Sequence, residues 1–186
     1  MLVVTGKNTS IIDTYIVDKD GLAEGPIPNR SNGITPFGFA FTQRDQLLVT
    51  EGFMASQFNG AASTYDIRED AVLSVISGTV RNNRTDTCWP VITDNQKYAY
   101  VSNALSGDVS SYTIQPDGTL VLLNSVAGIV PGINIDVALS NNSRYLYVRT
   151  ISSGTISVFE VQQDGRLTPL QVIGGIPPGA IGLAAK

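Results

Sequence analysis

One pattern recurs four times along the 186-residue chain and constrains its fold more than any other feature. Each copy is a short apolar run with an aromatic residue, found at intervals of 50, 47 and 47 residues at Tyr15, Tyr65, Tyr112 and Phe159. Six residues after the aromatic, each copy has Gly21, Ala71, Gly118 or Gly165, and an aspartate always comes directly before it. An Asp-Gly pair between two apolar runs predicts a tight β-hairpin with positive φ at both turn positions, so we expect a looser turn at Ala71.

Further apolar runs flank this hairpin. One precedes each aromatic run, at Leu2–Thr5, Leu47–Thr50, Tyr98–Asn103 and Tyr145–Thr150, and three copies have another at Phe37–Phe41, Pro90–Ile92 and Ile135–Leu139. Four short strands in about 47 residues are typical of a β-propeller blade. The sequence therefore predicts an all-β protein, a β-propeller of four four-stranded blades in one domain. The expected repeats are 1–35, 36–87, 88–133 and 134–178, with a closing strand at 179–186.

The same runs also carry a family resemblance. Tyr98–Asn103 and Tyr145–Arg149, each followed by an aromatic strand and an Asp-Gly-x-Leu turn, resemble the lactonase-type seven-bladed β-propeller family. That family includes bacterial 6-phosphogluconolactonase and fungal carboxymuconate-lactonizing enzyme. The ending Gly174–Leu183 is similar to the family's C-terminus, so the resemblance is to its C-terminal half. It implies a channel site of histidine, arginine and glutamate in the enzymes, and this chain has no histidine.

Composition excludes several kinds of function. With 12 Lys+Arg against 16 Asp+Glu, the net charge of -4 offers no basic surface for nucleic acid. Without histidine there is no Ser-His-Asp triad, Cys-His pair or His-ligated zinc. The lone Cys88 allows no disulfide within the chain and no multi-cysteine zinc site, and we expect it to be buried. We therefore expect no metal and no cofactor.

The sequence gives little information on compartment. Its first residues lack the basic and apolar regions of a signal peptide, and no stretch reaches the roughly 18 apolar residues of a membrane helix. The default expectation is a cytoplasmic protein with no membrane span. A secreted or cell-surface protein is the alternative if a preceding segment carries a signal.

The strand pattern starts on the second strand of a blade and ends on a first strand at 180–184. Unpaired strand edges favour aggregation, so something must cover them. The alternatives are a four-bladed ring, an eight-bladed two-fold dimer, or half of a longer propeller. We favour self-association into the dimer, because blades shaped for a ring of about seven would have to tilt steeply to close a ring of four.

Two loops on one face are candidate binding sites. The segment 52–60 is longer than its counterparts and contains Phe53 and Phe58, which either bind a ligand or pack over the neighbouring blade. The connection at 79–89 carries the other binding candidates, Arg81, Arg84, Asp86 and Trp89. Arginine beside an aromatic ring suits a small acidic sugar or lactone, although an exposed loop with a core tryptophan is the simpler interpretation.

Two charged residues at the ends of second strands are the catalytic candidates. Glu51 stands where other copies have Gly6, Asn103 or Thr150, and Arg149 replaces a serine or threonine. In a partly dry channel, Glu51 would act as a general base and Arg149 would stabilise an oxyanion. Equally, Glu51 would accept hydrogen bonds from its own loop. The favoured function is a binding or scaffold protein acting through its loop-rich face, and the alternative is a lactone hydrolase.

Overall fold

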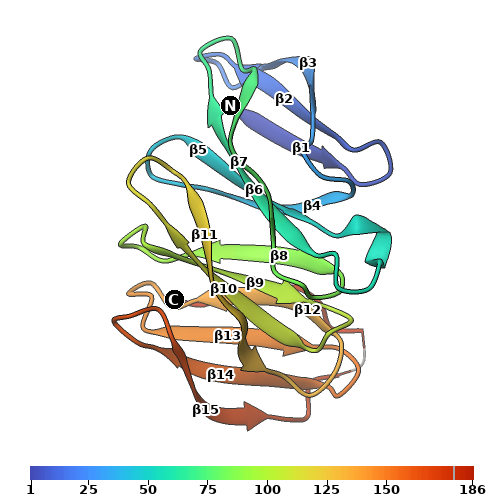
Figure 1. Cartoon of the computed structure of the whole chain (residues 1–186), viewed down its shortest axis with the longest axis vertical. Helices are drawn as coiled ribbons and strands as arrows, with labels where there is room; N and C mark the ends of the chain where they lie inside the picture. Colours follow the sequence, from blue (N-terminus) through green and yellow to red (C-terminus); the bar gives the residue numbers. More distant parts are fainter. Residues whose placement is uncertain (178) are drawn as a thin grey trace.

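The computed structural model describes residues 1–177 and 179–186, and strands make up most of the chain (Figure 1). The strands are β1 (Leu2–Gly6), β2 (Ile11–Val17), β3 (Ala23–Arg30), β4 (Pro36–Phe41), β5 (Gln46–Glu51), β6 (Ala61–Ile67), β7 (Leu73–Arg81), β8 (Thr87–Ile92), β9 (Tyr98–Asn103), β10 (Asp108–Ile114), β11 (Leu120–Ile129), β12 (Asn134–Leu139), β13 (Tyr145–Thr150), β14 (Thr155–Val161) and β15 (Leu167–Ile173). A short 3₁₀ turn, η1 (Phe53–Ala55), lies between β5 and β6.

The strands form four antiparallel sheets, each made from consecutive segments of the chain. The sheets are β1-β2-β3, β4-β5-β6-β7, β8-β9-β10-β11 and β12-β13-β14-β15. Figure 1 shows them following one another from the N-terminal end to the C-terminal end as blades. The predicted all-β, partial-propeller fold is therefore confirmed, with the first blade lacking its innermost strand. The innermost strands of the other three blades, β4, β8 and β12, are neighbours in space.

The core is divided among the junctions between neighbouring sheets. In the first junction, Val3 and Ile12 pack against Leu47, Val49 and Tyr65, and all five are buried. Because side chains alternate between the two faces of a strand, each middle sheet supplies apolar residues to both of its junctions. The recurring aromatic residue fills the equivalent place at the later junctions, as Tyr112 and Phe159.

The backbone conformation of the four hairpin turns differs from the one that the sequence predicted. Positive φ occurs only at the residue after the aspartate, with values of 83° at Gly21, 61° at Ala71, 87° at Gly118 and 80° at Gly165. In the third copy the Gly118 N–H donates to the Gln115 carbonyl at 2.9 Å, and the Gln115 N–H donates to the Thr119 carbonyl at 2.8 Å. This is a type I turn followed by a left-handed residue, so the prediction of positive φ at both positions was wrong.

The turn at Ala71 is not looser than the others. The Ala71 N–H donates to the Arg68 carbonyl at 2.9 Å, and the Arg68 N–H donates to the Val72 carbonyl at 3.0 Å, as in the glycine copies. The Ala71 carbonyl also accepts a hydrogen bond of 2.6 Å from the Thr14 hydroxyl in the first blade. This contact and the burial of the Ala71 methyl group hold alanine in a conformation that usually favours glycine.

The predicted closing strand does not form. Residues 179–186 contain no strand, and the Leu183 N–H donates instead to Asp136 Oδ2 at 2.8 Å. A strand needs a neighbour with open backbone groups, and the matching edge, β1, lies in the sheet at the opposite end of the row (Figure 1). The described chain therefore does not close into a four-bladed ring. Its described residues also include no helix long and apolar enough to cross a membrane.

Candidate functional site

A pocket of about 540 Å³ lies where the innermost strands begin. Strands β4, β8 and β12 each have an irregular register near their first residues. A bulge of this kind turns an extra side chain out of the ladder. The strand residues at these irregularities that line the pocket are Phe37, Cys88, Trp89, Ile135 and Asp136. We call this cavity the channel-mouth pocket.

The rest of the lining comes from loops of two kinds. Lys7, Ala104 and Ile151 lie between the second and third strands of their blades, and Asp86 and Ile133 precede innermost strands. Both kinds of loop therefore lie on one face of the molecule, as the blade pattern predicts. The repeat thus brings side chains that are far apart in sequence to one opening.

Aromatic rings form one wall of the channel-mouth pocket. Trp89 is 41% exposed, and its ring meets that of Phe37 edge to face at a centroid distance of 5.4 Å. The Lys7 Nζ lies 4.9 Å from the centroid of the Phe37 ring. An exposed indole with a polar N–H beside a cation suits a ligand that has both an apolar face and hydrogen-bonding groups.

Two carboxylates and a thiol complete the wall. Asp136 accepts hydrogen bonds from the Val137 N–H at 2.9 Å and the Leu183 N–H at 2.8 Å. Asp86 is half-buried, and the Cys88 thiol donates to its backbone carbonyl at 3.3 Å. Burial, reinforced by the charge of Asp86, raises the pKa of Cys88 to about 12. The thiol is therefore protonated at neutral pH and is a poor nucleophile.

The structure brings two of the predicted binding residues, Asp86 and Trp89, into this pocket. No described residue of the long loop between β5 and β6 lines the pocket. There, the Phe53 ring stacks under the Arg81 guanidinium with 3.9 Å between Cζ and the ring centroid. Phe58 is 61% exposed.

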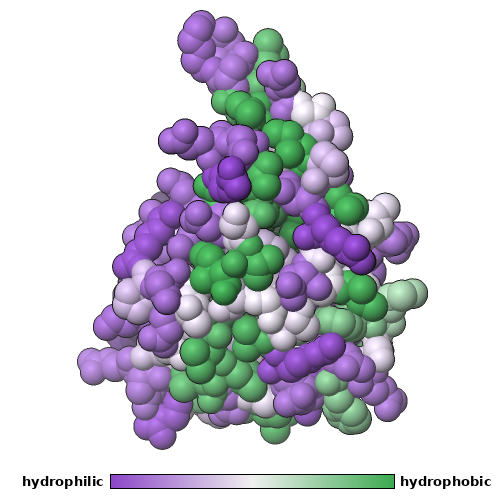
Figure 2. All heavy atoms as spheres, turned by 45° about the horizontal axis from the view of Figure 1, so that its top comes forward, coloured by the Kyte–Doolittle hydropathy of each residue, from purple (hydrophilic) through white to green (hydrophobic). Residues whose placement is uncertain are grey.

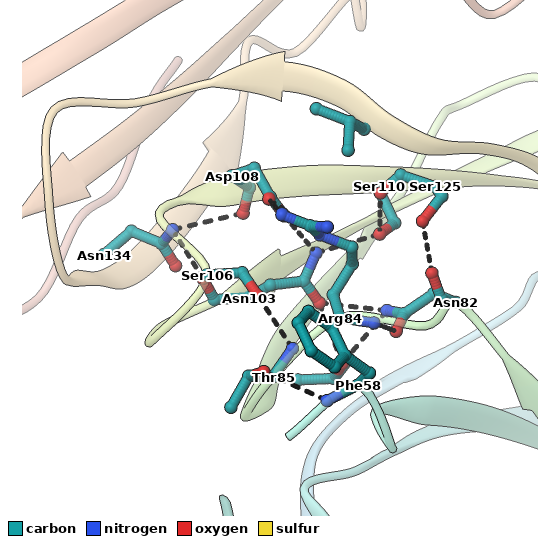
Figure 3. A network of polar contacts seen from close by, with 12 residues as sticks. Phe58, Asn82, Arg84, Thr85, Asn103, Ser106, Asp108, Ser110, Ser125 and Asn134 are labelled. Atoms are coloured by element: carbon teal, nitrogen blue, oxygen red, sulfur yellow. Dashed lines mark hydrogen bonds and ion pairs between the residues drawn. The ribbon is translucent and has the colours of Figure 1, made fainter. Parts of the chain in front are cut away.

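Arg84 lies in a polar network that joins the second, third and fourth blades (Figure 3). Its Nε donates to Asp108 Oδ2 at 2.8 Å, and Asn103 Nδ2 donates to Asp108 Oδ1 at 2.8 Å. Asn82 donates to the Asn103 side chain at 2.9 Å, and Asn134 donates to the Asn103 carbonyl at 3.1 Å. Arg84 thus fastens the β7–β8 loop to its neighbours, and its charge is neutralised within the protein.

Neither catalytic candidate lines the channel-mouth pocket. The buried Glu51 accepts hydrogen bonds through Oε1 from the Gly33 N–H at 2.8 Å and from the Ser63 hydroxyl. Its Oε2 has no hydrogen-bond partner among the described residues. Arg149 is buried and donates to the backbone carbonyls of Thr150, Thr155 and Pro177. The two side chains lie in different blades, Glu51 on β5 and Arg149 on β13, and among the described residues no hydrogen bond or ion pair joins them.

The protonation of Glu51 gives a prediction for pH dependence. Burial raises the pKa of Glu51 above its usual 4.5. Its contribution to stability is therefore complete below pH 4.5 and is lost as pH rises through the folded-state pKa. Glu51→Gln keeps an acceptor at Oε1 without the titration, so we expect the variant to be more stable than the parent at neutral pH. Urea unfolding across this pH range measures the difference.

Glu69→Gln is the control, because Glu69 is exposed in the turn between β6 and β7. We expect its stability to follow that of the parent as pH changes. If Glu51→Gln shows the same pH dependence as the parent, Glu51 does not titrate as its burial implies.

Sequence reasoning missed Lys7, Phe37 and Asp136 in the pocket. Lys7 and Phe37 lie in ordinary loop and strand patterns, and Asp136 interrupts an apolar strand, which was the one available signal. A polar residue in such a run marks a bulge that turns it away from the core. The sequence did not show which way each bulge turns, because that depends on the neighbouring blade.

Comparison with known proteins agrees with the fold. The family model described as Lactonase, 7-bladed beta-propeller matches residues 63–179. No curated protein matches the sequence significantly. Among solved structures, the periplasmic gluconolactonase of Pseudomonas aeruginosa is 18% identical with a TM-score of 0.72, and the match covers 92% of this chain and 51% of that one.

Two other solved structures are similar to the same extent. A protein from Lactobacillus plantarum is 18% identical with a TM-score of 0.75, over 92% of this chain and 53% of that one. A putative 6-phosphogluconolactonase from Bacteroides uniformis is 18% identical with a TM-score of 0.71, over 92% and 52%. The chain spans about half the length of these three structures. Because the family model covers more than half of its residues, the chain belongs to the seven-bladed lactonase β-propeller family.

Proposed function

We propose that this chain is a lactonase-like binding protein that holds a small hydroxylated ring in the channel-mouth pocket. The observation that carries the proposal is the exposed ring of Trp89 beside Phe37, Lys7 and Asp86 in a cavity of about 540 Å³. Cavities of this size hold small molecules, and a few polar groups in an apolar lining orient them. Binding on the loop-rich face also fits the variation of the loops there.

The experiment uses the tryptophan itself as the reporter. Trp89 is the only tryptophan in the chain, so its fluorescence reports on the channel-mouth pocket. Titration with glucono-δ-lactone and with neutral sugars is expected to change the fluorescence until it saturates. Asp86→Ala should weaken binding about tenfold, the effect of losing a charged hydrogen bond. Asp20→Ala, in the exposed turn after β2, is the control and should bind like the parent. A linear, unsaturable response to every sugar and lactone would overturn the proposal.

Lactone hydrolysis is the second candidate, and membership of the lactonase propeller family is the observation behind it. In this pocket the Asp86 carboxylate would accept a proton from the attacking water, and the Lys7 ammonium would stabilise the developing oxyanion. Lactone opening near neutral pH is expected to exceed the spontaneous rate, with Asp86→Asn losing that excess while retaining binding. Binding of the lactone without any excess rate would contradict hydrolysis and would leave binding as the only function.

We also propose that a second copy of the chain covers the open face of the first blade. Leu2 and Val4 are 47% and 45% exposed, whereas Leu47 and Val49, their counterparts in the second blade, are fully buried. Figure 2, with the top of Figure 1 turned forward, shows apolar side chains exposed among polar ones. Residues 180–184 have the sequence pattern of an innermost strand. In the assembly, these residues of one copy would pair with β1 of the other copy and complete its first blade, which gives a ring of eight blades.

Light scattering tests this assembly. The expected mass is twice the 19.8 kDa of the chain, and Val4→Lys should reduce it to a single chain mass, because a buried lysine opposes the contact. A single chain mass for the parent at every concentration would contradict the assembly. In the assembly the terminal segment would leave the pocket, and the Leu183 N–H would no longer donate to Asp136. The lining residues from β4, β8 and β12 and the hydrogen bond from the Val137 N–H to Asp136 would remain.

A further inference from the structure

We infer that the channel-mouth pocket selects an electrically neutral polyhydroxylated ring and discriminates against phosphorylated and carboxylated sugars. The inference rests on the proposed binding function and specifies its ligand class. It follows from the charges that line the pocket and from the arginines and backbone N–H groups of this face, which already bind other groups of the protein. It does not depend on whether the ligand is hydrolysed.

The charges within the pocket are the first observation. Among the described residues, the lining contains one cation, Lys7, and two carboxylates, Asp86 and Asp136. An anionic ligand would gain the attraction of one ammonium and meet two like charges in a partly desolvated space. Phosphate sites normally offer an excess of positive charge. The balance here favours a ligand without a negative charge.

The arginines of the same face are the second observation. Arg84 is paired with Asp108 at 2.8 Å, and Arg149 is buried on backbone carbonyls. Arg81 stacks on Phe53 in the separate β5–β6 loop. None of these three guanidinium groups lines the described pocket. Arginine, the residue best suited to a bidentate contact with phosphate, is thus engaged outside the pocket.

Backbone donors are the third observation. The N–H groups of Val137 and Leu183, which would attract an anion, both donate to the Asp136 carboxylate, at 2.9 and 2.8 Å. The protein's own carboxylate therefore occupies the anion-binding position at the β12 bulge. A bound phosphate would have to displace it and leave a carboxylate without donors.

The remaining groups suit hydroxyls. The Asp86 carboxylate can accept hydrogen bonds from hydroxyl groups, the Lys7 ammonium can donate to hydroxyl oxygens, and the exposed Trp89 ring can pack against the apolar face of a sugar ring. A neutral sugar or sugar lactone offers hydroxyls around its edge and C–H groups on its face. These are the groups that the pocket can satisfy without burying an unpaired charge.

The test compares three cyclic probes that differ mainly in charge: glucose, glucuronate and glucose 6-phosphate, titrated against Trp89 fluorescence. Glucose is expected to bind at least tenfold more tightly than glucose 6-phosphate. Asp86→Asn should narrow that ratio, because it removes one of the two repelling charges. Asp45→Asn, in the turn between β4 and β5 away from the pocket lining, should leave the ratio unchanged.

The outcomes separate this inference from the function on which it rests. Equal or tighter binding of glucose 6-phosphate overturns the charge selectivity and leaves the binding function standing. Failure of all three probes and of glucono-δ-lactone to bind overturns the binding function, and the inference with it. An unchanged ratio in Asp86→Asn, with glucose still preferred, overturns the assignment of that preference to the pocket carboxylates.

Discussion

Replacing Arg84 with methionine is expected to lower the free energy of unfolding by about 3 kcal/mol, the low end for breaking a buried ion pair. The Asp108 side chain is only 2% exposed and loses its cation, whereas the Arg84 side chain is 23% exposed, so solvent moderates the loss. The asparagine contacts of the network remain but cannot neutralise a buried carboxylate. Urea unfolding of the parent and the variant measures the difference.

Two further variants show whether the unpaired charge is the cause. Adding Asp108→Asn to Arg84→Met removes the orphaned charge, so the double variant should be more stable than Arg84→Met alone. Arg68→Met is the matched control, since Arg68 and Asp70 form a pair whose side chains are 57% and 56% exposed. It should change stability by less than about 1 kcal/mol. A loss in Arg84→Met no larger than in Arg68→Met would contradict the structural role of the network.

Gly38→Ala is expected to cost about 3 kcal/mol, the upper end for overpacking, and to weaken ligand binding in the channel-mouth pocket. A methyl group at Gly38 would lie 2.4 Å from the Cys88 carbonyl oxygen and 2.8 Å from Pro90 Cδ. The carbonyl belongs to the backbone of β8, so relief requires moving β4 away from β8. That movement would separate Phe37 from Trp89, which form the aromatic wall.

Gly174→Ala is the control for Gly38→Ala. A methyl group at Gly174 would have none of the described residues within 4 Å beyond its chain neighbours, so we expect almost no change in stability or binding. Thermal unfolding and Trp89 titration measure both effects on the same samples. If Gly38→Ala binds as tightly as the parent, the close contact between β4 and β8 does not shape the pocket.

The repeat predicted much of the fold because blade strands obey local rules. The continuous apolar run Leu47–Val49 in β5 is typical of a strand with both faces covered, and all three of its residues are fully buried. The turn type was harder to predict. Asp-Gly occurs in more than one hairpin geometry, and the contact that holds Ala71 in the same turn comes from Thr14, which is 57 residues away.

The candidate site was predicted less completely. Asp86 and Trp89 were identified from a loop with aromatic and charged residues, and both line the channel-mouth pocket. Glu51 was chosen because it differs from its counterparts in the other copies. In the structure, however, its carboxylate accepts hydrogen bonds from the Gly33 N–H before β4 and from the Ser63 hydroxyl on the adjacent strand. An unusual residue in a repeat signals a change in its surroundings, but not whether that change serves packing or binding.

The sequence alone determined the all-β class, the four-strand unit and the family, because hydrophobic alternation and turn residues act over a few positions of the chain. Tertiary structure decided which polar side chains meet at the channel mouth, where Lys7, Phe37 and Asp136 come from three different blades. It also left residues 179–186 without a strand. The physical reason is the same in both cases: a bulge or an edge acquires its surroundings from a neighbouring sheet, and local periodicity carries no information about that neighbour.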